Sequence, residues 1–110
     1  MRRVAITGLG LVSSLGHDVE SFWNATRNGE TGVAPTTIPE ADTLTARMVA
    51  EVKGWDGAKA LDRKLLGLSD RFSQFAVYAA KQAVEDAGDV ARDNAAIIIG
   101  TGVGLSLIHI

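Results

Sequence analysis

The 110-residue sequence contains no cysteine. A disulfide scaffold, a thiolate metal site and a cysteine nucleophile are therefore excluded for these residues. Charge is nearly balanced, with a formal net charge of -2, so nothing indicates a nucleic acid or a membrane surface as partner. No apolar run approaches the roughly 20 residues that cross a bilayer. Glycines interrupt the apolar stretch after Arg2 and Arg3, and the context for signal cleavage is poor, so we expect a cytoplasmic protein.

Histidine is scarce as well, since His17 and His109 are the only two. A metal site needs three or four converging ligands, so we predict no metal. We interpret His17 as a residue at a helix entry. Ser13 and Ser14 have no evident histidine and aspartate partners, so a serine nucleophile is not indicated.

What is present is ordinary for a soluble domain: 46% hydrophobic and 22% charged residues. The length suits one domain or part of one. Val4–Thr7 is a short apolar run typical of a strand covered on both faces. Gly8 and Gly10 follow, and would allow either a positive φ or close passage of a neighbour.

A first helix is predicted over Val19–Asn28, because apolar residues recur there at helical spacing. Asp18 is its expected N-cap, and Gly29 is expected just past its end. Gly29–Thr45 holds both prolines and is predicted to be an irregular surface loop. We expect the two tryptophans of the sequence, Trp23 and Trp55, to be packing residues rather than ligand platforms.

Alternation around Met48–Val52 predicts a short, half-exposed strand, and Asp56–Gly67 suggests one helical turn. The clearest element is a helix over Ser69–Ala87, with Ser69 as expected cap and Gly88 at its end. Its apolar face comprises Phe72, Phe75, Ala76, Ala79, Ala80, Ala83, Val84 and Ala87. So many alanines would let a second helix or a sheet approach closely, which places this helix in the middle of a layered fold.

A second strand-then-glycine pattern lies near the end of the sequence. Ala95–Ile99 is apolar and β-branched, and Gly100–Gly104 follows without the lysine of a phosphate loop. This cluster indicates close backbone packing or a loop that lines a cavity at a strand end. The order strand, helix, loop, strand, helix, strand favours an α/β layered fold.

Gly8–Ser13 is close to the dinucleotide fingerprint G-x-G-x-x-G, with Ser13 in place of the third glycine. In that fingerprint a helix begins inside the turn and holds the pyrophosphate. Here Ser14, Gly16 and His17 keep the backbone irregular, and no strand ending in an acidic residue follows the helix. A nucleotide-binding oxidoreductase domain therefore remains only as an alternative, behind a tight turn beside a packed layer.

Four segments together resemble the start of a β-ketoacyl-acyl-carrier-protein synthase, most of all the condensing enzyme of bacterial type II fatty acid synthesis that elongates longer chains. They are RRVAITGLGLVSSLG, VESFWNATRNGETGV, LDRKLLGLSDRFSQFAVYAAKQAVEDAG and IIIGTGVG. The resemblance runs from about Arg2 to Gly104 and covers only the first quarter of such an enzyme. Ser14 departs from it, because many members carry proline there.

The resemblance implies a thiolase-like layered α/β fold, of which residues 1–104 would be the N-terminal part of the first half. It implies a decarboxylative Claisen condensation, with acyl and malonyl groups delivered by acyl carrier protein, with no cofactor, and in a homodimer. The family's catalytic cysteine and both of its histidines would lie beyond residue 110, so no catalytic residue is assigned and this chain alone is expected to be inactive.

One site residue of the family has a counterpart in this sequence: Val103 looks like the residue that borders the acyl pocket in this family. Beyond Gly104 the resemblance ends, and we hypothesise that Leu105–Ile110 is a non-native tail. An alternative class stays open. Some ketosynthase-like proteins lack the cysteine and serve as non-catalytic partner subunits that set chain length, and a sequence without cysteine is compatible with that role.

Overall fold

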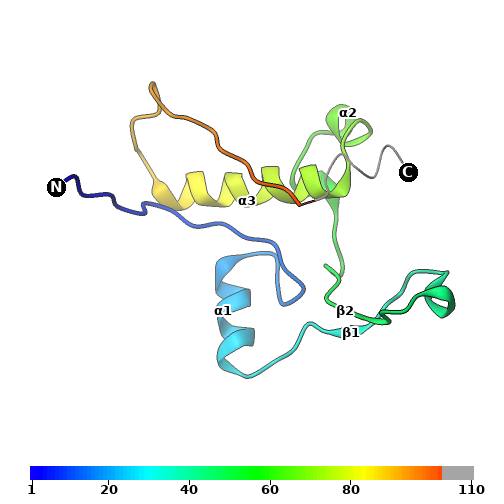
Figure 1. Ribbon diagram of the computed structural model, residues 1–110. Coiled ribbons are helices and arrows are strands. Elements are labelled where there is room, and N and C mark those ends of the chain that lie inside the picture. Colours follow the sequence, from blue (N-terminus) through cyan, green and yellow to red (C-terminus); the bar gives the residue numbers. More distant parts are fainter. Residues whose placement is uncertain (103–110) are drawn as a thin grey trace.

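The computed structural model describes residues 1–102, which are arranged around one long helix, α3 (Figure 1). In sequence order the elements are α1 (Val19–Arg27), β1 (Ala34–Pro35), the 3-10 helix η1 (Ala41–Thr43), β2 (Met48–Val49), the 3-10 helix η2 (Gly57–Lys59), α2 (Arg63–Leu66) and α3 (Arg71–Ala87). The predicted helical turn within residues 56–67 is thus two short turns, η2 and α2.

The first helix, α1, is confirmed, one residue shorter than predicted. The Asp18 carboxylate accepts a hydrogen bond of 2.8 Å from the Ser21 amide and so caps the helix. Gly29 follows with a φ of +69°, the left-handed conformation that glycine adopts at low cost just past a helix end.

The long helix α3 is confirmed as well, but its predicted cap is wrong. Asp70, not Ser69, occupies the N-cap position. The Ser69 hydroxyl instead donates to the Leu65 carbonyl at 2.7 Å and ties α3 to the preceding turn. Gly88 ends the helix as predicted, with a φ of +68°.

The two opening glycines lie flat against α3. A Cβ atom at Gly8 would meet the backbone at Ala83 and Ala87, and one at Gly10 would meet the backbone at Ala79 and Ala83. Neither glycine is among the positive-φ residues of the described segment, so close passage is the reason for glycine here. The alanines of α3 do allow a close approach, as predicted, but the approaching segment is the extended backbone of residues 8–10 and not a second helix or a sheet.

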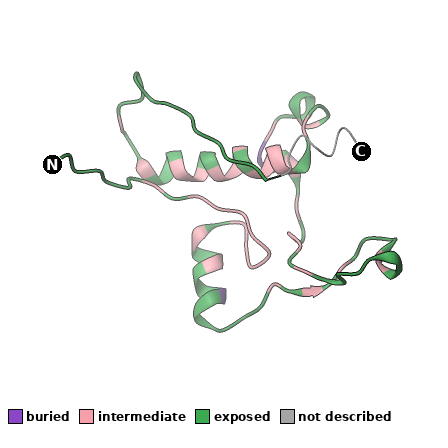
Figure 2. Ribbon diagram, in the orientation of Figure 1, coloured by how far each residue is buried: buried purple, intermediate pink, exposed green. Residues whose placement is uncertain are grey.

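The two predicted outer strands, Val4–Thr7 and Ala95–Ile99, are not formed within residues 1–102. A strand needs the backbone groups of a neighbour, and no described segment pairs with either of them. Both segments are extended and exposed, as their green colour in Figure 2 shows. The side chains of Val4 and Ile98 are 95% and 94% exposed. Both segments run antiparallel to α3 in the view of Figure 1, residues 95–99 along the helix and residues 4–7 beyond its C-terminal end.

The sheet that does form is the antiparallel hairpin of β1 and β2, with Ala34 opposite Val49 and Pro35 opposite Met48. The strand predicted around residue 48 is therefore confirmed in its first two residues. The loop predicted before it is not irregular throughout, because it supplies β1 and η1.

The fold is open. Its accessible surface is 9139 Å², against about 5800 Å² for a compact monomer of the same 11.6 kDa mass. Its radius of gyration is 16.7 Å, whereas a compact domain of this length has about 13 Å. Among residues 1–102 only Ala25 and Ala60 are buried. About 3300 Å² of surface is thus left uncovered relative to a compact domain.

Candidate functional site

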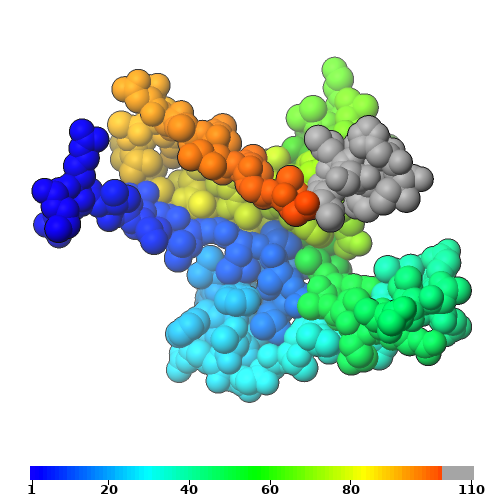
Figure 3. Space-filling view, in the orientation of Figure 1, coloured from blue at the N-terminus to red at the C-terminus, as the bar shows by residue number. Residues whose placement is uncertain are grey.

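An apolar groove runs along α3 beside residues 97–101. Its larger part has a volume of about 430 Å³, and its α3 side includes Ala76, Ala80 and Val84, opposite Ile97 and Ile99. In the space-filling view of Figure 3 the segment that follows α3 in sequence lies along the helix.

The groove continues into a second hollow of about 330 Å³, which Phe72 and Ser73 line together with Gly100 and Thr101. Ala76, Val77 and Ile99 border both parts. The glycine cluster after Ile99 therefore does line a hollow in its described part, the second of its two interpretations. Val103, the predicted substrate-binding residue, lies outside the described residues, as does the tail 105–110.

The predicted apolar face of α3 divides into two. Ala79, Ala83 and Ala87 meet the opening glycines. The row of Phe72, Ala76, Ala80 and Val84 lines the groove. Lys81, which no sequence pattern indicated, also borders the groove, and its ammonium donates to the carbonyl of the buried Ala60. A lysine beside an apolar stripe gives no signal of such a tether.

An aromatic cluster centred on Trp55 packs against another side of α3. Trp55 makes edge-to-face contacts with His17, Phe75 and Tyr78 at ring-centre distances of 5.5, 4.9 and 5.3 Å. Its indole donates to Gln74 at 2.9 Å. Trp55 is thus a packing residue as predicted. Trp23 does not pack within residues 1–102, where it is 57% exposed, because no described segment covers that face of α1.

The remaining candidates of the sequence are occupied in local structure. His17 forms a 2.8 Å hydrogen bond through Nε2 with the Lys53 carbonyl. The Ser13 hydroxyl donates to the Gly16 carbonyl and accepts from the Leu15 amide, which closes a turn. His109 lies outside the described residues. Residues 1–102 hold no cluster of three or more potential metal ligands.

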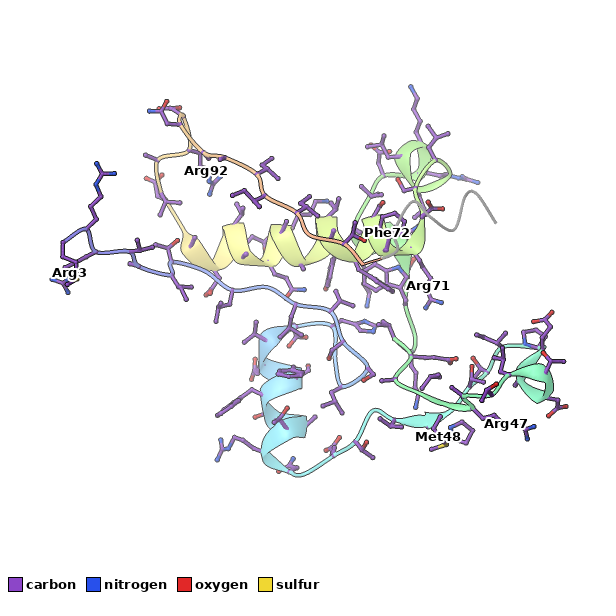
Figure 4. All side chains as sticks on the ribbon, viewed as in Figure 1. Arg3, Arg47, Met48, Arg71, Phe72 and Arg92 are labelled. Carbon is purple, nitrogen blue, oxygen red and sulfur yellow. The ribbon has the colours of Figure 1, made fainter. Side chains whose placement is uncertain are left out.

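Nothing in the described geometry forms a dinucleotide cradle at Gly8–Ser13. The nearest helix start after these glycines is Val19, and Gly10 faces the backbone of α3 instead of open space. The arginines labelled in Figure 4, Arg3, Arg47, Arg71 and Arg92, are spread over the molecule and form no common patch. None of the helices within residues 1–102 is long and apolar enough to cross a membrane.

Two carboxylates, those of Asp18 and Glu51, have pKa values lowered by local hydrogen bonds. The pKa of Asp18 is lowered, chiefly by the hydrogen bond from the Ser21 amide that caps α1. The pKa of Glu51 is lowered by the hydroxyls of Thr36 and Thr37, each at 2.7 Å, and by the Thr37 amide. Both groups hold local structure and face no shared cavity, so neither is a candidate acid or base.

Comparison with known proteins points to one family. A sequence model of the β-ketoacyl synthase N-terminal domain matches residues 1–108. The 3-oxoacyl-[acyl-carrier-protein] synthase 2 of Coxiella burnetii is 43% identical over 107 residues, which are 94% of this chain and 26% of that protein. The proteins of the same name from Synechocystis and Vibrio cholerae are each 36% identical over the same shares. The chain thus spans about a quarter of the length of these relatives.

Proposed function

This chain belongs to the β-ketoacyl synthase N-terminal domain family, and from that premise we propose that residues 1–104 form the first part of a 3-oxoacyl-acyl-carrier-protein synthase of fatty acid synthesis. The observation that carries the proposal is the match of the family over residues 1–108. Its partners would be acyl carrier protein and a second copy of the whole enzyme, in the cytoplasm.

The reaction would proceed through a cysteine that these residues do not contain. The acyl group is held on that cysteine as a thioester, and a malonyl group on acyl carrier protein loses carbon dioxide. The resulting carbanion attacks the thioester carbonyl, a carbon–carbon bond forms, and the thiolate leaves. No external oxidant or reductant is needed. The 110-residue chain by itself would accept no acyl group, because it has no thiol.

The described geometry supports a layered fold of the thiolase type. Residues 4–7 and 95–99 both run antiparallel to α3, which is the direction expected of two parallel strands joined through a crossover helix (Figure 1). Their apolar side chains are exposed, and the uncovered area of about 3300 Å² on this one chain exceeds the about 1000–2500 Å² that one partner contributes to an obligate interface. Further strands and helices of the whole protein would cover this surface.

The groove supports a role of residues 97–101 and their neighbours in binding the acyl chain. It is apolar, it follows α3, and it ends at Gly100 and Thr101, two residues before Val103. An apolar pocket gains about 0.8 kcal/mol for each methylene it buries, so the side chain at its border can select acyl length. We therefore assign Val103 to the border of the acyl pocket.

A chimera tests the function. Residues 1–104 of this chain would replace the matching part of the Coxiella burnetii relative, which then supplies the remainder of the enzyme. We expect the chimera to elongate acyl groups bound to acyl carrier protein, and its Val103→Phe variant to lose the longer acceptors while it keeps the shorter ones. A Val90→Phe variant, at a half-buried position outside the groove, is the control.

A chimera that folds but elongates no acyl group would contradict the proposal.

The reading frame that contains this chain separates the enzyme from the non-catalytic alternative. A cysteine at the start of a later helix, followed by two histidines, identifies a condensing enzyme. Glutamine in place of that cysteine identifies a partner subunit.

A further inference from the structure

Two polar side chains of α3 hold the backbone of residues 8–17, which we call the opening segment. The Leu9 amide donates to Asp86 at 2.9 Å, and the Leu11 amide donates to the Gln82 carbonyl oxygen at 3.4 Å. The Gln82 amide nitrogen donates in turn to the carbonyls of Leu11, at 3.1 Å, and of His17, at 2.6 Å. We call Gln82 and Asp86 the α3 clamp.

The clamp works because the two segments have matching repeats. Leu9 and Leu11 are two residues apart in an extended backbone, which spans about 6.7 Å. Asp86 and Gln82 are four residues apart in a helix, which spans about 6 Å. Each two-residue step along the opening segment therefore meets one four-residue step back along α3.

The small residues follow the same repeat. Gly8 lies over Ala83 and Ala87, and Gly10 lies over Ala79 and Ala83. One further step would bring Val12 toward Phe75, where neither side chain is small. The backbone leaves the helix there, in the turn closed by the bridge between Ser13 and Gly16.

We propose that the α3 clamp is a register lock, which fixes the backbone of residues 8–11 and the His17 carbonyl on α3 without help from a neighbouring strand. The carboxamide of Gln82 offers one acceptor and two donors, so it can pair with both backbone groups of Leu11 as a neighbouring strand would. The alignment is specific, because a slip by one residue would turn Leu9 or Leu11 toward α3 where only glycine fits. Residues 4–7 have no such partner among the described residues and stay exposed.

Amide hydrogen exchange on the 110-residue chain tests the lock. We expect the amides of Leu9 and Leu11 to exchange at least about tenfold more slowly than those of Val4 and Ile6, after correction for intrinsic rates. Equal rates in these two groups would overturn the proposal. The inference does not depend on the enzymatic function, and an inactive chimera would leave this measurement unaffected.

A matched pair of variants identifies the side chain responsible. Gln82→Met keeps the length and helix propensity of the side chain but removes its hydrogen bonds. Glu85→Met makes a similar change three residues along α3, at a side chain without a hydrogen bond in residues 1–102. We expect Leu11 to lose its protection in the first variant only, while the Val77 amide within α3 stays protected in both.

Unchanged protection of Leu11 in Gln82→Met would also overturn the proposal. If that variant unfolds α3, the proposal is tested instead by the exchange rate of the side-chain NH₂ protons of Gln82 in the unsubstituted protein. Because they are bonded to two carbonyls, they should exchange at least about tenfold more slowly than those of a glutamine in an unstructured peptide. Exchange at the peptide rate would refute the lock.

Discussion

Gly10→Ala should detach the opening segment from α3. A Cβ atom at this position would lie 2.8 Å from both the Ala83 amide nitrogen and the Gln82 Cβ, and it would also meet the Ala79 carbonyl. These atoms belong to the helix itself and cannot rotate away. The segment must therefore move outward, and overpacking of this kind costs about 1–3 kcal/mol. Gly8→Val should cost at least as much, since its side chain would meet the backbone at Ala83 and Ala87.

The fluorescence of Trp55 measures this effect, because its ring contacts His17 at one end of the docked segment and Phe75 on α3. Trp23, which is 57% exposed, would first be replaced by phenylalanine to leave one emitter. Urea titration of the emission should then show the loss of about 1–3 kcal/mol as a lower midpoint with a similar slope.

Gly100→Ala is the control, because a Cβ atom there would meet nothing within 4 Å and the residue has no positive φ. We expect its midpoint to stay within the range of about 0.5 kcal/mol usual for surface substitutions. Equal midpoints for Gly10→Ala and Gly100→Ala would refute the argument that close passage requires glycine at position 10.

Two further outcomes follow from the shifted carboxylates. Asp18→Ala should reduce the helicity of α1 and cost about 1 kcal/mol, which circular dichroism and amide shifts can measure, whereas Asp18→Asn should keep most of the cap. Glu51 has a pKa below its ordinary 4.5 in the folded hairpin, so its contribution is complete above 4.5 and is lost as the pH falls through the lower folded value. The amide shift of Thr37 should follow that loss, and a Glu51→Gln variant should show no such step; a step that persists in Glu51→Gln would assign it to another group.

Local sequence signals were sufficient for the two longer helices, α1 and α3. Helical spacing and terminal glycines located α1 and α3 to within two residues, since caps and apolar periodicity act within one segment. The cap of α3 was placed wrongly at Ser69 because Asp70 is as good a cap residue, and the choice between neighbours depends on how the previous turn packs. β1 was missed because Ala34–Pro35 has no strand pattern of its own and pairs only because β2 lies opposite.

The predicted outer strands illustrate the opposite case. Their composition is that of buried strands, but strand formation depends on partners distant in sequence, and residues 1–102 supply none. The groove could be anticipated in part from the alanines of α3, although not its far wall at Ile97 and Ile99. The α3 clamp had a readable signal, two polar residues four apart beside the small-residue face, but their partners are backbone groups that no side-chain pattern reveals.

The matched repeats of the opening segment and α3 have a consequence for evolution. A substitution at most positions of either segment changes one contact, but the loss or gain of one residue between Gly8 and Leu11 would shift all later contacts onto wrong partners. The same holds between Ala79 and Ala87. Insertions and deletions among descendants of this sequence should therefore accumulate in the hairpin and its loop, and the lengths of these two stretches should stay constant while their residues diverge.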